Sequence, residues 1–389
     1  METQTINPLP APGFRNRLQL GAKSYVMVFA LLIIWLLFFL LTQGTFLSPR
    51  NLSNLARQMS ITGILALGMV LIIVAGHIDL SAGAVVALTG AASAILQVRF
   101  GWGLTEAVGI ALLIGLAIGF WQGFWVCYLR VPAFIVTLGG MMIFRGVVLG
   151  VTEGRTISPL PNGFVAIGQS FLPVEIGWVL AVIGMVYYVY ARVKRRIDRR
   201  RYGFEVLPLI LEVLVILGVM GLIGLSVWVM NDYEGVPFPV LLLLGLALCF
   251  VVISRKTRFG RYLYAIGGNN EAARLSGINI RLTTMFAFVL MGILCAIGGI
   301  VLTARLNGAT TSAGTSFEMD AIASCVIGGT SLMGGEGSVV GAIIGALVMA
   351  SLDNGMVLLN TPTYWQYIVK GFILMAAVLV DFQMKRRGN

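Results

Sequence analysis

Three polar residues of types that bind ligands or carry protons lie close together in the segment GHIDLSAG. They are His77, Asp79 and Ser81, and long apolar runs flank them on both sides. Ionisable residues at membrane depth are costly and commonly mark a substrate path. This segment is therefore either the polar lining or gate of such a path, or a short connecting loop. In the second case Asp79 would cap a helix starting near Ser81 and His77 would lie among headgroups. His77 is the only histidine, which excludes a histidine metal cluster.

A second polar turn resembles the first one. GTSLMGGEGSVVGA, from Gly329 to Ala342, also interrupts an apolar region and continues as Gly-small-Val-Val. Transporters are often built from two repeats with the substrate path at broken segments between them, although chance similarity remains an alternative in so glycine-rich a chain. Thr330, Ser331 and Glu336 are accordingly predicted to lie along the path.

Two cations stand alone within apolar runs, Arg145 in IFRGVV and Lys370 in YIVKGF. Each either snorkels to a membrane interface or pairs with an acid across the bundle. The acids within the runs look scattered, and no acidic relay, zinc-type HExxH or nucleophile elbow is seen. No lysine completes a P-loop, so this chain does not hydrolyse ATP by that route. Neither a catalytic set nor a metal site is predicted.

One polar segment is rich in helix-capping residues. In GGNNEAARLSGIN, Asn269 or Asn270 can cap a short helix whose first turn contains Glu271, and Gly277 can end it. The candidate interaction residues of this helix are Glu271, Ala272, Ala273, Arg274, Leu275, Ser276 and Gly277. Its small side chains suit docking into a groove of a partner, and a simple surface helix is the alternative.

The elements that position these residues are apolar. Of the 389 residues, 58% are hydrophobic and only 11% are charged, against about 25% charged in soluble domains. Lipid is therefore the natural solvent. Twelve apolar runs are long enough, or nearly so, to be membrane helices: 25–42, 60–76, 83–98, 106–128, 132–152, 177–192, 206–230, 238–253, 283–304, 321–333, 338–353 and 365–381.

The predicted fold is an all-α polytopic membrane protein with about 10–12 transmembrane helices. Run 83–98 is short, and 321–333 is too short for a regular crossing, so a broken or re-entrant segment is expected near 321–337. Close glycine pairs such as Gly115–Gly119 and Gly341–Gly345 favour tight packing within one subunit, with a dimer interface as the alternative. The four cysteines lie in apolar runs and predict buried core residues rather than disulfides.

Basic residues cluster in a few segments between runs, which indicates cytoplasmic loops. Both termini are then predicted to be cytoplasmic. Because the net charge of +11 is concentrated in these loops, it does not indicate a nucleic-acid-binding protein. The predicted organisation is a tail at 1–24, a transmembrane domain at 25–382 with cytoplasmic loops at 191–205 and 254–282, and a tail at 383–389. The 254–282 loop holds the short helix.

Long segments resemble the permease subunits of bacterial ABC importers for ribose, galactose, arabinose and xylose. They include ITGILALGMVLIIVAGHIDLSAG, VPAFIVTLGGMMIFRG, YAIGGNNEAARLSGIN, CVIGGTSLMGGEGSVVGAIIGALVMASLDNGM and PTYWQYIVKGF. The resemblance runs from about residue 24 to residue 386. Extra material between about 190 and 237 is most similar to the xylose-type branch. EAARLSG corresponds to the family's coupling helix and fits EAAxxxG, but lacks the Leu-Pro that follows in other importers.

The resemblance implies a homodimeric permease in the bacterial inner membrane. Partner ATPase subunits would bind ATP and Mg, this chain would need no cofactor, and a periplasmic sugar-binding protein would deliver a monosaccharide, expected to be xylose or another pentose. The alternatives are a self-sufficient ion-coupled transporter or channel, which would need coupling residues within the spans, and a membrane-embedded enzyme.

Overall fold

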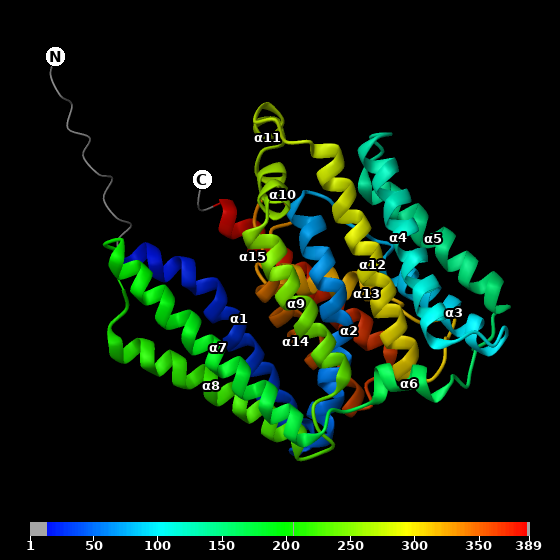
Figure 1. Cartoon of the computed structure of the whole chain (residues 1–389), viewed down its shortest axis with the longest axis horizontal. Helices are drawn as coiled ribbons and strands as arrows, with labels where there is room; N and C mark the ends of the chain where they lie inside the picture. The colour runs from blue at the N-terminus through cyan, green and yellow to red at the C-terminus, as the bar shows by residue number, and fades with distance from the viewer. Residues whose placement is uncertain (1–13, 205, 387–389) are drawn as a thin grey trace.

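The computed structural model describes residues 14–204 and 206–386 and is built from helices (Figure 1). Within this part of the chain there are no regular strands, and isolated bridges join Ile157 to Ala309 and Phe171 to Pro237. The helices are α1 (Phe14–Leu41), η1 (Thr45–Leu47), α2 (Pro49–Val74), α3 (Ala82–Val98), α4 (Leu104–Cys127), α5 (Ala133–Thr152), α6 (Asn162–Gln169), α7 (Val174–Arg201), α8 (Leu209–Asn231), α9 (Phe238–Lys256), α10 (Arg258–Gly268), α11 (Asn270–Leu275), α12 (Ile280–Leu306), α13 (Phe317–Ile327), α14 (Val339–Leu358) and α15 (Thr363–Arg386).

Each of the twelve predicted apolar runs lies largely within one of these helices, which confirms the all-α polytopic fold. Eight helices are long and apolar enough to cross a membrane, and three shorter apolar stretches, Met27–Leu41, Ala82–Val98 and Thr363–Leu379, accompany them. The segment suspected near 321–337 is irregular as expected. Helix α13 has only 11 residues, and a turn follows it from Gly328 to Ser338.

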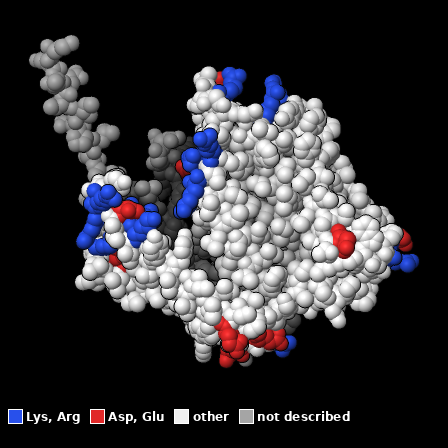
Figure 2. Space-filling model, in the orientation of Figure 1, with Lys and Arg blue, Asp and Glu red and all other residues white. Residues whose placement is uncertain are grey.

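Helices α10 and α11 lie at one end of the bundle, where basic residues gather. This end is named the basic end. Figure 2 shows lysine and arginine over α11, over the start of α12 and at the end of α7, with acidic residues gathered mainly at the other end. Segment 191–205, predicted as a loop, is instead mostly the last turns of α7, which continue through Arg201. Arginine is a good helix former, so the run of basic residues extends α7 beyond its apolar part.

Helices α2–α5 and α12–α15 form two halves with matching contacts. Helix α2 packs on α13 and α14, while α12 packs on α3 and α4; likewise α3 contacts α5, and α13 contacts α15. Helix α2 ends at the basic end, whereas α12 starts there, so the halves run in opposite directions through the bundle. The arrangement is an inverted repeat.

The matching broken segments are 75–81, before α3, and 307–316, before α13. The same tripeptide occurs at both places, as Ser81-Ala82-Gly83, which runs into the start of α3, and as Ser312-Ala313-Gly314 within the second segment. The repeat predicted from sequence, which paired Gly76–Leu88 with Gly329–Ala342, is therefore wrong in its second member. The turn at 329–337 connects α13 to α14 and has a different place in the fold.

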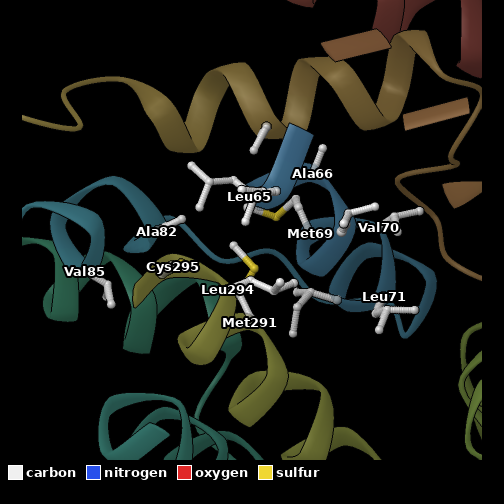
Figure 3. Packing of buried hydrophobic residues seen from close by; sticks show 14 of the residues in the cluster. Leu65, Ala66, Met69, Val70, Leu71, Ala82, Val85, Met291, Leu294 and Cys295 are labelled. Atoms are coloured by element: carbon white, nitrogen blue, oxygen red, sulfur yellow. The ribbon is translucent and has the colours of Figure 1, made fainter. Parts of the chain in front are cut away.

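The core forms where α2 and α12 meet the two short helices. Figure 3 shows Leu65 and Met69 of α2 facing Met291 and Leu294 of α12, with Ala82 and Val85 of α3 beside them. Backbone contacts between helices depend on glycine. A methyl group at Gly115 or Gly119 would overlap α12, and one at Gly341 or Gly345 would overlap α13. These pairs thus pack within the subunit, as the sequence favoured.

Helices α7 and α8 form a hairpin that projects away from most of the bundle, and α8 contacts α2 (Figure 1). Glu212 at the start of α8 is neutralised by Arg196 of α7, so the two charges are buried as a pair. Three of the four cysteines are buried as expected, but Cys249 on α9 is exposed on the apolar surface.

Candidate functional site

The predicted coupling segment is an exposed helix with well-formed ends. The Asn269 side chain accepts a hydrogen bond from the Ala272 amide at 2.9 Å and so caps α11. Glu271 pairs with Arg274 at 2.5 Å within the helix. Gly277 has φ +79°, a conformation that glycine adopts without strain, and it ends the helix as predicted. Leu275 is 79% exposed, so the helix presents an unpartnered apolar side chain at its tip.

Helix α10 anchors this segment to the bundle. Its inner face buries Leu263 and Ile266, and the Tyr264 hydroxyl donates a hydrogen bond to the Gly337 carbonyl at 2.9 Å. Burial raises the pKa of Tyr264, so the hydroxyl keeps its proton. Gly267 lies directly against the carbonyl oxygen of Val74 at the end of α2. Through α10, the predicted coupling segment therefore contacts both halves of the repeat, the first at Val74 and the second at Gly337.

The turn that contacts α10 contains three of the predicted path residues, Thr330, Ser331 and Glu336. The Ser331 amide donates to the Glu336 carbonyl at 3.0 Å, which closes a tight turn, and the Gly335 amide donates to the Val74 carbonyl at 2.9 Å. Gly334 packs against Gly76 and Gly267. The turn therefore joins α2 to α10 at the basic end, directly behind the coupling segment.

Asp79 and Ser81 lie in the bundle interior, in the first broken segment. Asp79 is 2% exposed and accepts hydrogen bonds from the Ser81 amide at 2.8 Å and the Ser81 hydroxyl at 2.7 Å. Gln122 of α4 donates to the same hydroxyl at 2.6 Å. Asp79 thus serves the start of α3, as the loop interpretation proposed, but at a buried position. His77 is half-buried and its ring lies 6.0 Å from that of Phe288.

The start of α3 crosses the second broken segment at Gly83 and Gly314. A methyl group at either glycine would overlap the carbonyl oxygen of the other. A carboxylate oxygen of Glu318 on α13 also lies against Gly83, and Arg145 of α5 donates to the carbonyls of Thr311 at 3.2 Å and Ala313 at 2.8 Å. Arg145 therefore supports the second segment by binding its backbone.

Lys370 pairs with acids across the bundle, which was one of its two predicted alternatives. Its amino group lies 3.0 Å from a carboxylate oxygen of Asp320 on α13 and 2.8 Å from one of Asp353 on α14. The expectation that acids within the spans are scattered is wrong here. The three residues look isolated because they are far apart along the chain. No sequence pattern marks them as neighbours.

A further polar group that the sequence did not indicate lies at the end opposite the basic end. Arg305 of α12 donates to Asn54 of α2 at 3.2 Å, and the guanidinium of Arg57 lies 5.2 Å from the centre of the Phe171 ring. In the described residues neither arginine has a carboxylate partner. Among those residues, no group of three or more His, Cys, Asp or Glu side chains could hold a metal ion.

These features define a class of protein. An inverted repeat with broken helices, enclosed by membrane-length helices and carrying an exposed helix at one end, is the architecture of a membrane permease. A family model described as branched-chain amino acid transport system / permease component matches residues 51–378. The chain belongs to this family of permeases.

Similar proteins extend along nearly the whole chain. The xylose transport system permease protein XylH of Escherichia coli (strain K12) is 47% identical over 382 residues, which is 96% of this chain and 95% of that protein. XylH of Haemophilus influenzae (strain Rd) is 46% identical over 94% of this chain and 97% of its own length. The ribose import permease protein RbsC of E. coli K12 is 38% identical over 86% and 87%. No solved structure matches the chain.

Proposed function

We propose that this chain is the membrane subunit of an ATP-driven importer for xylose or a closely related pentose. The observation that carries this proposal is the 47% identity to a xylose permease over 96% of the chain. The family description names branched-chain amino acids, but the full-length relatives named above are xylose and ribose permeases. Sugar is therefore the better-supported cargo.

The proposed assembly contains two copies of this chain in the bacterial inner membrane, with both termini in the cytoplasm. ATPase subunits, which bind ATP and Mg, dock on the basic end, and a periplasmic binding protein delivers the sugar to the opposite end. This chain itself needs no cofactor and carries no hydrolytic site. The exposed Leu275 of α11 supports docking at the basic end, because a large apolar side chain on a short polar loop is suited to a partner's groove.

Coupling in this proposal follows the contacts of α10. A push on Glu271–Gly277 is transmitted through α10 to the Val74 carbonyl and to the turn at 330–337. The two contacts belong to different halves of the repeat. Val74 precedes α3 in the first half, and the turn at 330–337 follows α13 in the second. ATP binding can then bias the inward-open and outward-open arrangements because it changes contacts made differently in the two states. Asp79 and Ser81 would line the path between them.

The decisive experiment reconstitutes the permease in liposomes with the ATPase and binding protein of its transport system. Xylose should be taken up and should stimulate ATP hydrolysis more than ribose, arabinose or leucine does. Stimulation by leucine alone would overturn the sugar assignment.

The buried group of Asp320, Asp353 and Lys370 is the one observation that favours an ion-coupled transporter instead. A relay of ionisable residues is what such a protein would need. Xylose uptake by the permease alone, driven by a sodium or proton gradient without ATP, would establish that alternative and refute the proposed ATPase partner.

A further inference from the structure

A cavity of about 770 Å³ lies between the last turns of α7 and the end of α9. Five cations line it from two walls: Lys194, Arg195 and Arg199 of α7, and Arg255 and Lys256 of α9. Figure 2 shows basic residues at the end of each helix, on either side of a hollow. Small-molecule sites typically measure roughly 300–1,000 Å³, so this cavity is large enough for a ligand.

Both walls change from apolar to basic at the cavity. In α7 the apolar run ends at Ala191 and basic residues follow it, and in α9 the apolar run ends just before Arg255. Tyr187 and Tyr190 of α7 also line the cavity. Tyrosine is enriched where the hydrocarbon of a membrane meets its headgroups. The cavity therefore lies at the level of the lipid headgroups.

The placement of these cations is more than a topology signal. Cations that only fix the orientation of a membrane protein need no particular arrangement within their loops. Here α8 separates the two walls along the chain, yet the fold brings both to one cavity. Asp198 is the one acid among the described lining residues, which leaves an excess of four positive charges. Like charges around one space repel unless an anion neutralises them.

The hairpin treats its other cation differently. Arg196 of α7 is paired with Glu212 of α8, so the positive charge inside the hairpin is neutralised by the chain itself. The five cations that line the cavity are exposed, and no ion pair between described residues uses any of them. These cations are therefore available to an anion from outside the chain.

The lining favours a phosphate that is attached to a lipid. Arginine binds phosphate through two parallel hydrogen bonds, and lysine binds it as a point charge. A free phosphate ion would use only these charges, whereas about half of the exposed lining is apolar. The Lys194 amino group lies 5.9 Å from the centre of the Tyr190 ring, so charge and apolar surface are presented together. Basic pockets between membrane helices are suited to anionic lipid headgroups.

We propose that this cavity binds an anionic phospholipid, whose phosphates lie between α7 and α9. A lipid with two phosphates, such as cardiolipin, can contact both walls at once, so it should bind more tightly than phosphatidylglycerol, which has one. Its acyl chains would extend along the apolar parts of the two helices, and the lipid would bridge the α7–α8 hairpin and α9. This inference requires only a membrane permease and does not depend on the cargo or on the ATPase.

Native mass spectrometry of the delipidated full-length permease in a neutral detergent tests the site. Cardiolipin should bind most tightly, phosphatidylglycerol less tightly and the zwitterionic phosphatidylcholine least. Equal binding of cardiolipin and phosphatidylcholine would overturn the proposal. Millimolar inorganic phosphate should not displace cardiolipin, and displacement would show that the cavity takes a free anion instead of a lipid.

Two matched double variants locate the bound lipid. Arg195→Gln with Arg255→Gln removes one cation from each wall and should raise the dissociation constant of cardiolipin about thirtyfold, since each cation near a lipid headgroup contributes roughly fivefold. Arg200→Gln with Arg201→Gln removes the same charge from exposed positions that do not line the cavity, and should change it by about twofold or less. Equal effects of the two double variants would indicate diffuse attraction and refute the site.

Two further measurements separate charge from structure and lipid from protein. Arg195→Lys with Arg255→Lys keeps both charges and should retain most of the cardiolipin binding, because lysine also binds phosphate. A loss as large as that of the glutamine variant would contradict a site built on charge. Cardiolipin should also stay bound when the ATPase subunit is added. Displacement by the ATPase would assign these cations to a protein interface and overturn the lipid site.

Discussion

Gly83 and Gly314 meet backbone to backbone where the start of α3 crosses the second broken segment, each facing the carbonyl oxygen of the other. The contact joins the halves of the inverted repeat through matching Ser-Ala-Gly tripeptides. Neither position has space for a side chain, so the crossing depends on two glycines that belong to different halves of the chain.

Gly83→Ala should destabilise the protein, because the new methyl group overlaps the Gly314 carbonyl. Overpacking of this kind costs about 1–3 kcal/mol, although alanine is favoured over glycine in a helix by roughly 1 kcal/mol. Thermal unfolding of the purified permease measures the change. Gly146→Ala on α5, where nothing lies within 4 Å, should be neutral or stabilising, and equal effects of the two substitutions would refute the close crossing.

Lys370→Met should be strongly destabilising, by about 3–5 kcal/mol, because the buried carboxylate of Asp320 and the half-buried one of Asp353 lose the cation that they share. Adding Asp320→Asn and Asp353→Asn to Lys370→Met should recover most of the loss. Unfolding midpoints in one detergent provide the comparison. A triple variant no more stable than Lys370→Met would show that the ion group does not explain the loss.

Gly277→Pro should abolish transport and sugar-stimulated ATP hydrolysis while the permease still folds. Proline cannot adopt φ +79° and removes the amide that donates to the Arg274 carbonyl at 3.0 Å. Gly203→Pro at the end of α7 makes the same two changes, at φ +71° and with a 3.1 Å bond to the Arg200 carbonyl, and should leave coupling intact. Deletion of 271–277 should also abolish transport, and wild-type transport by that deletion would end the coupling assignment.

Tyr264→Phe should weaken the coupling of ATP hydrolysis to sugar uptake with a stability loss of only about 1 kcal/mol, since it removes one hydrogen bond to Gly337. Tyr262→Phe, two residues away and exposed, is the control. The ratio of sugar transported to ATP hydrolysed measures the effect. An unchanged ratio would exclude this bond from the coupling route.

The Tyr264 bond should also be insensitive to pH across the neutral range. Because burial raises the pKa of this tyrosine above its ordinary value of 10.0, its contribution to stability is complete below pH 10.0 and is lost as the pH rises through the higher folded value.

Local features of the fold were predictable from the sequence. Hydropathy located every apolar helix, and Asn269 and Gly277 located the ends of α11, because these signals act within one or two turns. Helices α6 and α10 were missed, since one is short and the other lies in a polar loop. The partnership of Lys370 with Asp320 and Asp353 depends on which helices are neighbours, and no residue spacing reports that. The segment that matches 75–81 in the second half of the repeat was not predicted, because 307–316 contains no charged side chain and so lacks the signal that marked 77–81.

The α7–α8 hairpin adds an even number of membrane crossings to the chain. Three long helices, α7, α8 and α9, separate the two halves of the repeat, and an odd number of crossings is what makes the second half enter the membrane from the other side. A hairpin adds two crossings and so leaves parity unchanged. A chain joined directly from the end of α6 to α9 would keep the same opposed halves, so the hairpin is an insertion that the repeat accommodates without any change of topology.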